Sequence, residues 1–154
     1  MSSSQYRFSQ LRAGKCGLSE AAAISALYSD FNYGSGYQKL SIADIKLVCR
    51  HNHVIIVRDS HGQEQPIVGM LALAVSHLLD GPIGKVEHPM IRRGFEILSV
   101  PLFAEAIKHL KRQGVEKVEV IHRVRGVAWP HRAALQELGL GLIGAHVLRV
   151  NLSA

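Results

Sequence analysis

A basic turn connects a predicted strand to a predicted helix within Glu87-His-Pro-Met-Ile-Arg-Arg-Gly-Phe-Glu-Ile-Leu-Ser99. Lys85 to Ile91 alternates as a half-buried strand does. A helix is expected from about Ser99, because apolar residues recur at helical spacing. These are Leu102, Phe103, Ala106, Ile107 and Leu110. The first N–H groups of a helix lack internal partners and its dipole favours negative charge, so the turn is a candidate anion site. The alternative is a plain connection with two solvated arginines.

The composition indicates a single globular domain that spans residues 1–154. Hydrophobic residues make up 47% of the 154 positions, and charged residues make up 19%. No apolar run reaches the roughly 20 residues that cross a bilayer, and the N-terminus lacks an apolar signal-peptide core. The two cysteines, Cys16 and Cys49, do not suggest a disulfide framework. We therefore expect a cytoplasmic protein.

The net charge of +6 favours an anionic partner, either nucleic acid or a phosphate-bearing cofactor. The chain has no Lys/Arg tail and no aromatic residues interleaved with a basic stripe, which disfavours nucleic acid. No helix pattern suggests a membrane-binding face. No cluster of histidine, cysteine and carboxylate residues has the spacing of metal ligands, so no metal is expected.

The first part of the chain predicts a strand followed by a pair of helices. Tyr6 to Leu11 alternates weakly, as a short strand does. Ser19 is the expected N-cap of the first helix. The apolar positions of that helix are Ala22, Ala23, Leu27 and Phe31. Ser41 and Asp44 have the spacing of a capping box and predict a second helix.

A glycine-rich segment, Asn32 to Gly36, is expected between these helices. Tyr33 and Tyr37 lie beside its glycines and are candidate substrate-binding residues, because loops with aromatic side chains often line binding sites. The alternative is that both tyrosines pack down on the core.

The middle of the chain predicts an antiparallel meander. His53 to Asp59 and Ile67 to Val75 are strands, and the second is apolar enough to be central in a sheet. Gly69 within it suggests a bulge or a close approach of another backbone. A turn at Asp80 to Gly84 leads into the strand before the basic turn.

The helix that is expected from about Ser99 should end at Gly114, because glycine is common just after the last residue of a helix. Lys117 to His122 is the next strand, Pro130 to Leu138 is a short helix, and Leu142 to Ala145 forms a hairpin with His146 to Leu152. The predicted order is β-α-α-β-β-β-α-β-α-β-β.

This order and several motifs resemble the GCN5-related N-acetyltransferase (GNAT) superfamily. Ile67 to Leu73 resembles the "vGxxxl" strand, and Arg93 to Leu98 resembles the "RGxGIG" turn that binds the pyrophosphate of acetyl-CoA. Ala106 to Val120 looks like the passage from helix to fifth strand. His131 to Gly139 looks like the last helix, and Val147 to Leu152 is similar to the closing strand.

The resemblance implies an α/β (α+β) fold with a mixed, mostly antiparallel central sheet flanked by helices. It implies transfer of an acetyl group from acetyl-CoA to a primary amine of a small molecule or peptide, and leaves a homodimer possible. The cofactor would lie in a splay between the fourth and fifth strands. The residues it assigns to cofactor binding are Met90, Ile91, Arg92, Arg93, Gly94, Phe95, Glu96, Ile97, Leu98 and Ser99.

Acetyl transfer needs a neutral amine and a stabilised thioester oxygen. In the family, backbone N–H groups of the fourth strand bind that oxygen, here around His88 to Ile91, where Pro89 has no N–H. Glu87 is the first candidate for the base, with His88 and His122 as alternatives. The competing interpretation is that these three are ordinary strand residues.

The sequence departs from the family pattern at three positions. Glu96 and Leu98 replace glycines of the turn, and Leu135 replaces a tyrosine that often protonates the leaving thiolate. These departures support an alternative function, in which a catalytically degenerate protein acts as a ligand-binding or regulatory module.

Overall fold

The computed structural model describes residues 5–11, 15–30, 40–121, 132–139, 141–144 and 147–151. The order of its elements is β1 (Tyr6–Leu11), α1 (Leu18–Asp30), α2 (Ile42–His51), β2 (His53–Asp59), β3 (Ile67–Leu78), β4 (Gly81–Ile91), α3 (Ser99–Arg112), β5 (Lys117–Ile121), α4 (Arg132–Glu137), β6 (Gly141–Gly144) and β7 (Val147–Asn151). A 3-10 turn, Glu96–Leu98, precedes α3. The predicted order of strands and helices is confirmed.

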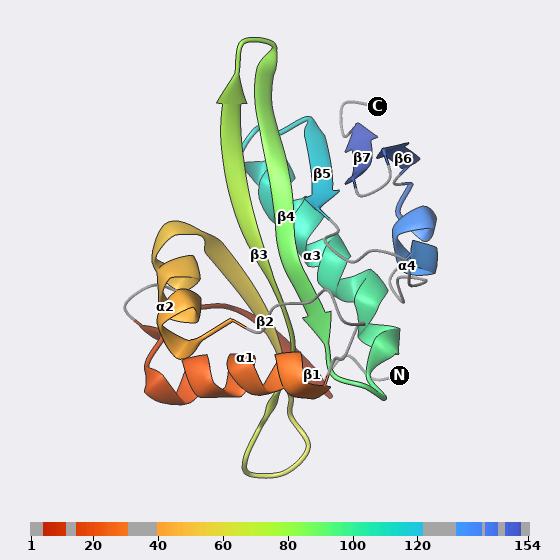
Figure 1. The fold of residues 1–154 in the computed structure, drawn as a ribbon. Coiled ribbons are helices and arrows are strands. Elements are labelled where there is room, and N and C mark those ends of the chain that lie inside the picture. The colour runs from red at the N-terminus through yellow and green to blue at the C-terminus, as the bar shows by residue number, and fades with distance from the viewer. Residues whose placement is uncertain are drawn as a thin grey trace.

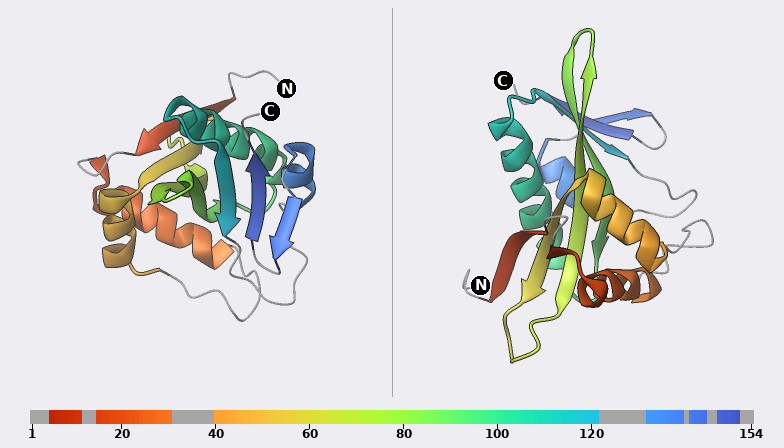
Figure 2. Two further views of the ribbon diagram at one scale, coloured as in Figure 1. Left: turned by 90° about the horizontal axis from the view of Figure 1, so that it is seen from above. Right: turned by 90° about the vertical axis from the view of Figure 1, so that its left-hand side faces the viewer.

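The strands of the described residues form one seven-stranded sheet in the order β1-β2-β3-β4-β5-β7-β6. Neighbouring strands are antiparallel except β4 and β5, which are parallel. The predicted mixed, mostly antiparallel sheet is therefore confirmed. Helices α1 and α2 cover one face, and α3 covers the other (Figures 1 and 2).

The core has one apolar cluster on each face of the sheet. Along β2, Val54 and Ile56 belong to the cluster under α1 and α2, whereas Ile55 and Val57 belong to the cluster under α3. Successive strand residues point to opposite faces, so a strand covered on both faces must be apolar throughout. This explains why β2 and β3 have long apolar runs.

A bulge interrupts β3 at Gly69, as the sequence predicted. Val57 pairs with Gly69, but Arg58 pairs with Ile67, so β3 carries an extra residue. A Cβ atom at Gly69 would lie 2.7 Å from Cγ1 of Val57 and 3.2 Å from the carbonyl oxygen of Met90. Both of the predicted reasons for this glycine, a bulge and a close backbone approach, are confirmed.

Another bulge lies in β4, opposite β3. Met70 pairs with Met90 and Ala72 pairs with Glu87, which leaves two β4 residues opposite one β3 residue. The extra residue reverses the facing of the strand beyond it. Val86 therefore packs under α3, whereas Met90, four positions later, packs under α1 and α2.

The predicted helix caps of α2 and α3 are present. The Ser41 hydroxyl accepts from the Asp44 N–H at 3.1 Å, and the Ser41 N–H donates to the Asp44 carboxylate at 3.2 Å. At the end of α3, Gly114 has φ +77°. Its N–H donates to Lys111 at 3.0 Å, and the Val115 N–H donates to Leu110 at 3.2 Å, which is a Schellman motif.

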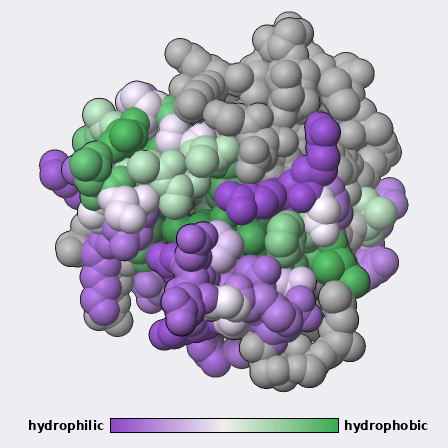
Figure 3. Space-filling view, turned by 90° about the horizontal axis from the view of Figure 1, so that it is seen from below, coloured by the Kyte–Doolittle hydropathy of each residue, from purple (hydrophilic) through white to green (hydrophobic). Residues whose placement is uncertain are grey.

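For α1 the predicted start was wrong, and its predicted inward face was right at Ala23 and Leu27 and wrong at Ala22, while Phe31 lies outside the described residues. The helix begins at Leu18, and the Gly17 carbonyl accepts from the Ala21 N–H at 3.1 Å, so Ser19 lies inside the helix. Its buried residues are Ala21, Ile24, Ser25 and Leu27. Ala22 is exposed. Apolar residues lie on most sides of α1, so their spacing in the sequence does not show which side faces the core. Hydrophobic residues accordingly reach the surface on the side of the molecule that α1 occupies (Figure 3).

The predicted turn at Asp80 to Gly84 was also wrong, because most of it belongs to β4. Strand β3 runs to Leu78 and pairs with Gly81, so only Leu79 and Asp80 form the turn. Gly81 has φ +115°, which a glycine adopts without strain. The result is a long hairpin that projects beyond the rest of the sheet (Figure 1).

On the α3 face, two histidines link β2 to α3. The rings of His53 and His109 stack with centroids 3.7 Å apart. Each ring has a glutamine partner: Gln10 Nε2 lies 2.6 Å from His53 Nδ1, and Gln113 Nε2 lies 2.8 Å from His109 Nε2. Burial, and then the nearby charge of Arg112, lower the pKa of His109.

This lowered pKa predicts a loss of stability in acid. In the unfolded chain His109 binds a proton near its ordinary pKa of about 6.5, whereas in the folded chain protonation is disfavoured. Protonation therefore favours the unfolded chain, and the free energy of unfolding falls as the pH drops below about 6.5. Chemical denaturation between neutral and acidic pH should show a weaker pH dependence for His109→Gln than for the wild type. His77→Gln, on the exposed hairpin, is the matched control. Equal slopes for wild type and His109→Gln would contradict the prediction.

Candidate functional site

Strands β4 and β5 pair over a short distance and then separate. Their parallel register runs from Ile83 opposite Lys117 to Val86 opposite Val120. Strand β4 continues to Ile91, and beyond Val86 the register pairs it with none of the described residues of β5. Figure 1 shows β4 descending away from β5. Between Val86 and Ile91, the edge of β4 that faces away from β3 is therefore not paired with any described residue of β5.

The backbone of β4 directs an N–H group to this edge. The Arg92 N–H donates to the Val68 carbonyl at 2.7 Å, so it points toward β3. Successive N–H groups in a strand point to opposite edges, so the Ile91 N–H points away from β3. Pro89, in the bulge, has no N–H. Ile91 is therefore the donor that the strand geometry offers on the open side.

Glu87 and His88 lie together at the start of the bulge. Glu87 is opposite Ala72, which packs under α1 and α2, so its carboxylate is on that face of the sheet. His88 has φ +52°, in the left-handed region. Its Nε2 lies 3.9 Å from Oε2 of Glu87, and both side chains are mostly buried, with 16% and 25% exposed. The bulge brings together two side chains that a regular strand would send to opposite faces.

The basic turn after β4 is tight and leads directly into α3. The Phe95 N–H donates to the Arg92 carbonyl at 3.0 Å, and Gly94 has φ +90°. Arg93 and Gly94 are exposed, and Arg92 is half-buried. The 3-10 turn then passes into α3 at Ser99. Cationic side chains thus precede a helix N-terminus, as an anion site requires.

The residues that replace the family's glycines behave differently from each other. Leu98 is 4% exposed and packs under α3, so its side chain points into the core. Glu96 is exposed, and its carboxylate accepts from the Gly94 N–H at 3.0 Å. A backbone donor of the turn is therefore engaged by a side chain of the same turn.

The other predicted cofactor residues are distributed between the core and the surface. Met90 and Ile91 are buried on opposite faces of the sheet, so their backbone atoms are what they can offer to a ligand. Phe95 meets Tyr6 edge-on, with ring centroids 6.3 Å apart. Ile97 is 59% exposed, and Ser99 is 3% exposed.

Three of the predicted site residues lie outside the described residues: Tyr33, Tyr37 and His122. Leu135, at the tyrosine position of the family, is completely buried in the cluster under α3. Among the described residues, no group of three or more His, Cys, Asp and Glu side chains is placed to hold a metal. No described helix has the length and apolar character to span a membrane.

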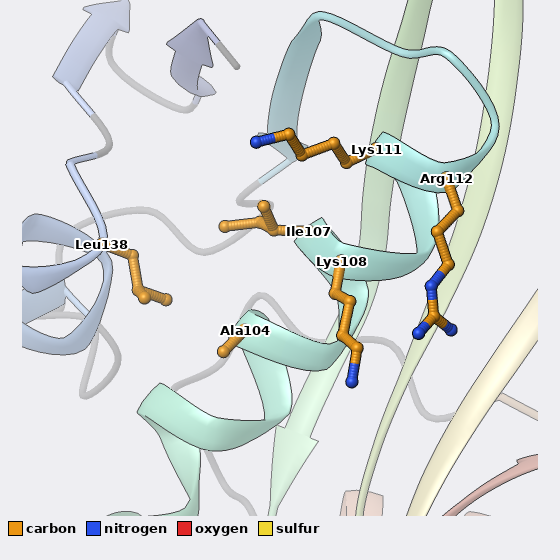
Figure 4. Close-up of a pocket in the computed structure, with 6 residues that line it drawn as sticks. All are labelled: Ala104, Ile107, Lys108, Lys111, Arg112 and Leu138. Atoms are coloured by element: carbon orange, nitrogen blue, oxygen red, sulfur yellow. The ribbon is translucent and has the colours of Figure 1, made fainter. Parts of the chain in front are cut away.

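An open hollow of about 470 Å³ lies between α3 and the end of α4 (Figure 4). Ile107 and Leu138 approach each other across it, and the basic side chains lie around its rim. The residues that line it are Ala104, Ile107, Lys108, Lys111, Arg112 and Leu138. It follows the C-terminal half of α3, whereas the basic turn is at the N-terminus of that helix, so it is separate from the predicted site.

No protein-family model matches the sequence, and no curated protein matches it. Solved structures do match. The acetyltransferase of GNAT family from Streptococcus pneumoniae is 10% identical with a TM-score of 0.66, over 97% of this chain and 100% of that chain. A chain of the NatC complex bound to Gag peptide and CoA is 14% identical with a TM-score of 0.73, over 97% of this chain and 99% of that chain.

An aminoglycoside acetyltransferase from an uncultured soil metagenomic sample is 12% identical with a TM-score of 0.63, over 89% of this chain and 87% of that chain. These likenesses extend over nearly the whole of both chains at low identity. The chain therefore has the GNAT fold, as its motifs predicted.

The sequence did not predict the bulge at His88 and Pro89 or the hydrogen bond between Gly94 and Glu96. The first had a signal, because proline within a central strand is confined to bulges and strand ends. The second had none, because whether a carboxylate folds back onto its own turn depends on the three-dimensional path of the chain.

Proposed function

We propose that this protein is an N-acetyltransferase that transfers an acetyl group from acetyl-CoA to a primary amine of a small molecule. The observation that carries the proposal is the end of β4, where the separation from β5, the bulge and the basic turn occur within ten residues of one another. Each supplies one requirement of acetyl transfer. The GNAT fold of the chain supports the same reaction class.

The acceptor amine would approach from the face covered by α1 and α2, where the Glu87 carboxylate lies. A protonated amine cannot attack a thioester, so a base must remove its proton. Glu87 performs this step directly or through water, and His88, 3.9 Å away, is the alternative base. The segment with Tyr33 and Tyr37 joins the two helices of this face and supplies the rest of the acceptor site.

The thioester would lie along the open edge of β4, with its oxygen directed at the Ile91 N–H. Negative charge develops on that oxygen during attack, and a fixed backbone donor stabilises it there. The pyrophosphate would lie at the turn, near Arg93 and the N-terminus of α3. Leu135 cannot donate a proton, so the departing thiolate takes its proton from water.

The alternative is a protein with this fold that binds a ligand without catalysis. The Glu96 carboxylate favours it, because this group occupies the Gly94 N–H and adds negative charge where a phosphate would bind. Binding and turnover experiments distinguish the two functions.

Calorimetric titration with acetyl-CoA, and with CoA as a reference, should give micromolar binding to the wild type. Arg93→Ala removes an exposed cation beside the pyrophosphate and should weaken binding about tenfold, the loss expected for one charge-assisted hydrogen bond. Arg50→Ala, at the exposed end of α2, is the control and should bind as the wild type does. No binding at millimolar ligand would refute the proposed function.

Changes at Glu96 should strengthen CoA binding. Glu96→Gln removes the negative charge and keeps an oxygen that can accept from Gly94, whereas Glu96→Gly removes both. We expect the first to lower the dissociation constant roughly threefold to tenfold, because the group is exposed and its repulsion is screened. The second should lower it further if the Gly94 N–H binds phosphate. Equal or weaker binding by both variants would mean that the turn does not contact the cofactor.

Glu87→Gln should separate catalysis from cofactor binding. If Glu87 is the base, kcat for an amine panel should fall about 10²- to 10⁴-fold while the dissociation constant of CoA stays unchanged. His88→Gln tests the alternative base in the same assay. A Glu87→Gln variant with the wild-type kcat and pH profile would remove Glu87 from the mechanism.

A further inference from the structure

The two cysteines of the chain come from different segments and pack in the same part of the core. Cys16 lies between β1 and α1, and Cys49 lies in the last turn of α2. Cys49 is 2% exposed, within the cluster under α1 and α2. Cys16 packs against that cluster and is partly exposed. Both are free thiols.

Cys49 belongs to the apolar cluster under α1 and α2, and Cys16 packs against the same cluster. Burial, and then a hydrogen bond and charge interaction with Cys16, raise the pKa of the Cys49 thiol to about 12. Cys49 therefore remains protonated at neutral pH and is shielded from solvent. Cys16 is the thiol that a dissolved reagent can reach first.

We propose that Cys16 and Cys49 form a dithiol site, which low-molecular-weight disulfides oxidise to an intramolecular disulfide. The sulfur of Cys16 attacks the reagent disulfide, forms a mixed disulfide and releases one thiol. The sulfur of Cys49 then loses its proton, attacks the sulfur of Cys16 and releases the second thiol. The balance is one protein dithiol and one reagent disulfide in, and one protein disulfide and two reagent thiols out.

The new bond would tie α2 to the segment that enters α1 and would enclose the connection between the two helices. Both helices cover the face on which the Glu87 carboxylate lies, so oxidation would restrain the acceptor side of the proposed function and leave the cofactor turn unchanged. This regulatory consequence rests on the proposed function, whereas the oxidation itself does not.

The first experiment treats the full-length chain with oxidised glutathione and follows its intact mass and free thiols. The expected product has lost two hydrogen atoms and both free thiols. Its melting temperature should exceed that of the reduced chain by roughly 5–15 °C, because the bond closes the loop from residue 16 to 49. A chain that stops at a glutathione adduct, or that keeps both thiols reduced, would overturn the proposal.

Single variants test the order of the two steps. Cys49→Ala should stop at the mixed disulfide and gain one glutathione, whereas Cys16→Ser should stay unmodified because its remaining thiol is buried. Modification of folded Cys16→Ser as fast as the wild type would contradict the assigned order. The wild-type mass and thiol measurement needs neither variant, so poor folding of a variant would not affect it.

The regulatory part is tested on reduced and oxidised wild-type protein. Oxidation should change KM for the acceptor at least several-fold and leave the dissociation constant of CoA unchanged. A disulfide that forms without any change in acceptor KM would refute this part alone. Absence of transferase activity in both forms would refute the proposed function, while the mass and melting results would still decide the dithiol site.

Discussion

Strand β3 from Ile67 to Leu73 and the end of β4 that pairs with it are covered on both faces, so an apolar side chain in this part must point into one of the two core clusters. The extra residue in β4 makes this possible. In a regular strand, Val86 and Met90 would share a face, but the bulge sends them to opposite clusters. Gly69 completes the arrangement, because it lies opposite Ile91 where a side chain would collide with Val57. Packing on two faces thus requires an irregular backbone at the end of β4.

The same irregularity arranges the candidate site. A proline in a regular central strand would remove a hydrogen bond between neighbouring strands. At a bulge the regular hydrogen bonding is already interrupted, so the missing N–H of Pro89 disrupts the sheet less. His88 adopts a left-handed conformation that costs on the order of 1–3 kcal/mol, and the burial of Met90 and Ile91 beyond it offsets that cost. The Glu87 carboxylate then lies on the face under α1 and α2, and the Ile91 N–H points to the open edge of β4, both at positions fixed by the core.

The parts of the fold that repeat a simple period could be predicted from sequence. The strands, the caps at Ser41 and Gly114, and the order of elements follow from alternation, helical spacing and glycine geometry. On the inward face of α1, Leu27 was predicted correctly, but Ala22 was predicted in place of Ala21, because the two alanines are equally apolar and only packing distinguishes them. Within the candidate site, residue types were predictable, but the contact between Glu87 and His88 depends on the bulge. Periodicity does not reveal which residue of a strand is the extra one.

The turn before α3 shows how far a departure from a motif constrains function. Leu98 replaces a glycine but points into the core, so it leaves the approach to the turn open. Glu96 replaces another, and its carboxylate accepts from the Gly94 N–H in a hydrogen bond that is exposed to solvent, where water competes with it. Under the proposed function, a pyrophosphate would bring more negative charge to Arg93 and to the dipole of α3 than the single Glu96 carboxylate does. Under that function, the pyrophosphate would displace the Glu96 carboxylate from the Gly94 N–H. Under the proposed function, Glu96 would therefore lower the affinity of the turn for the cofactor without closing the turn.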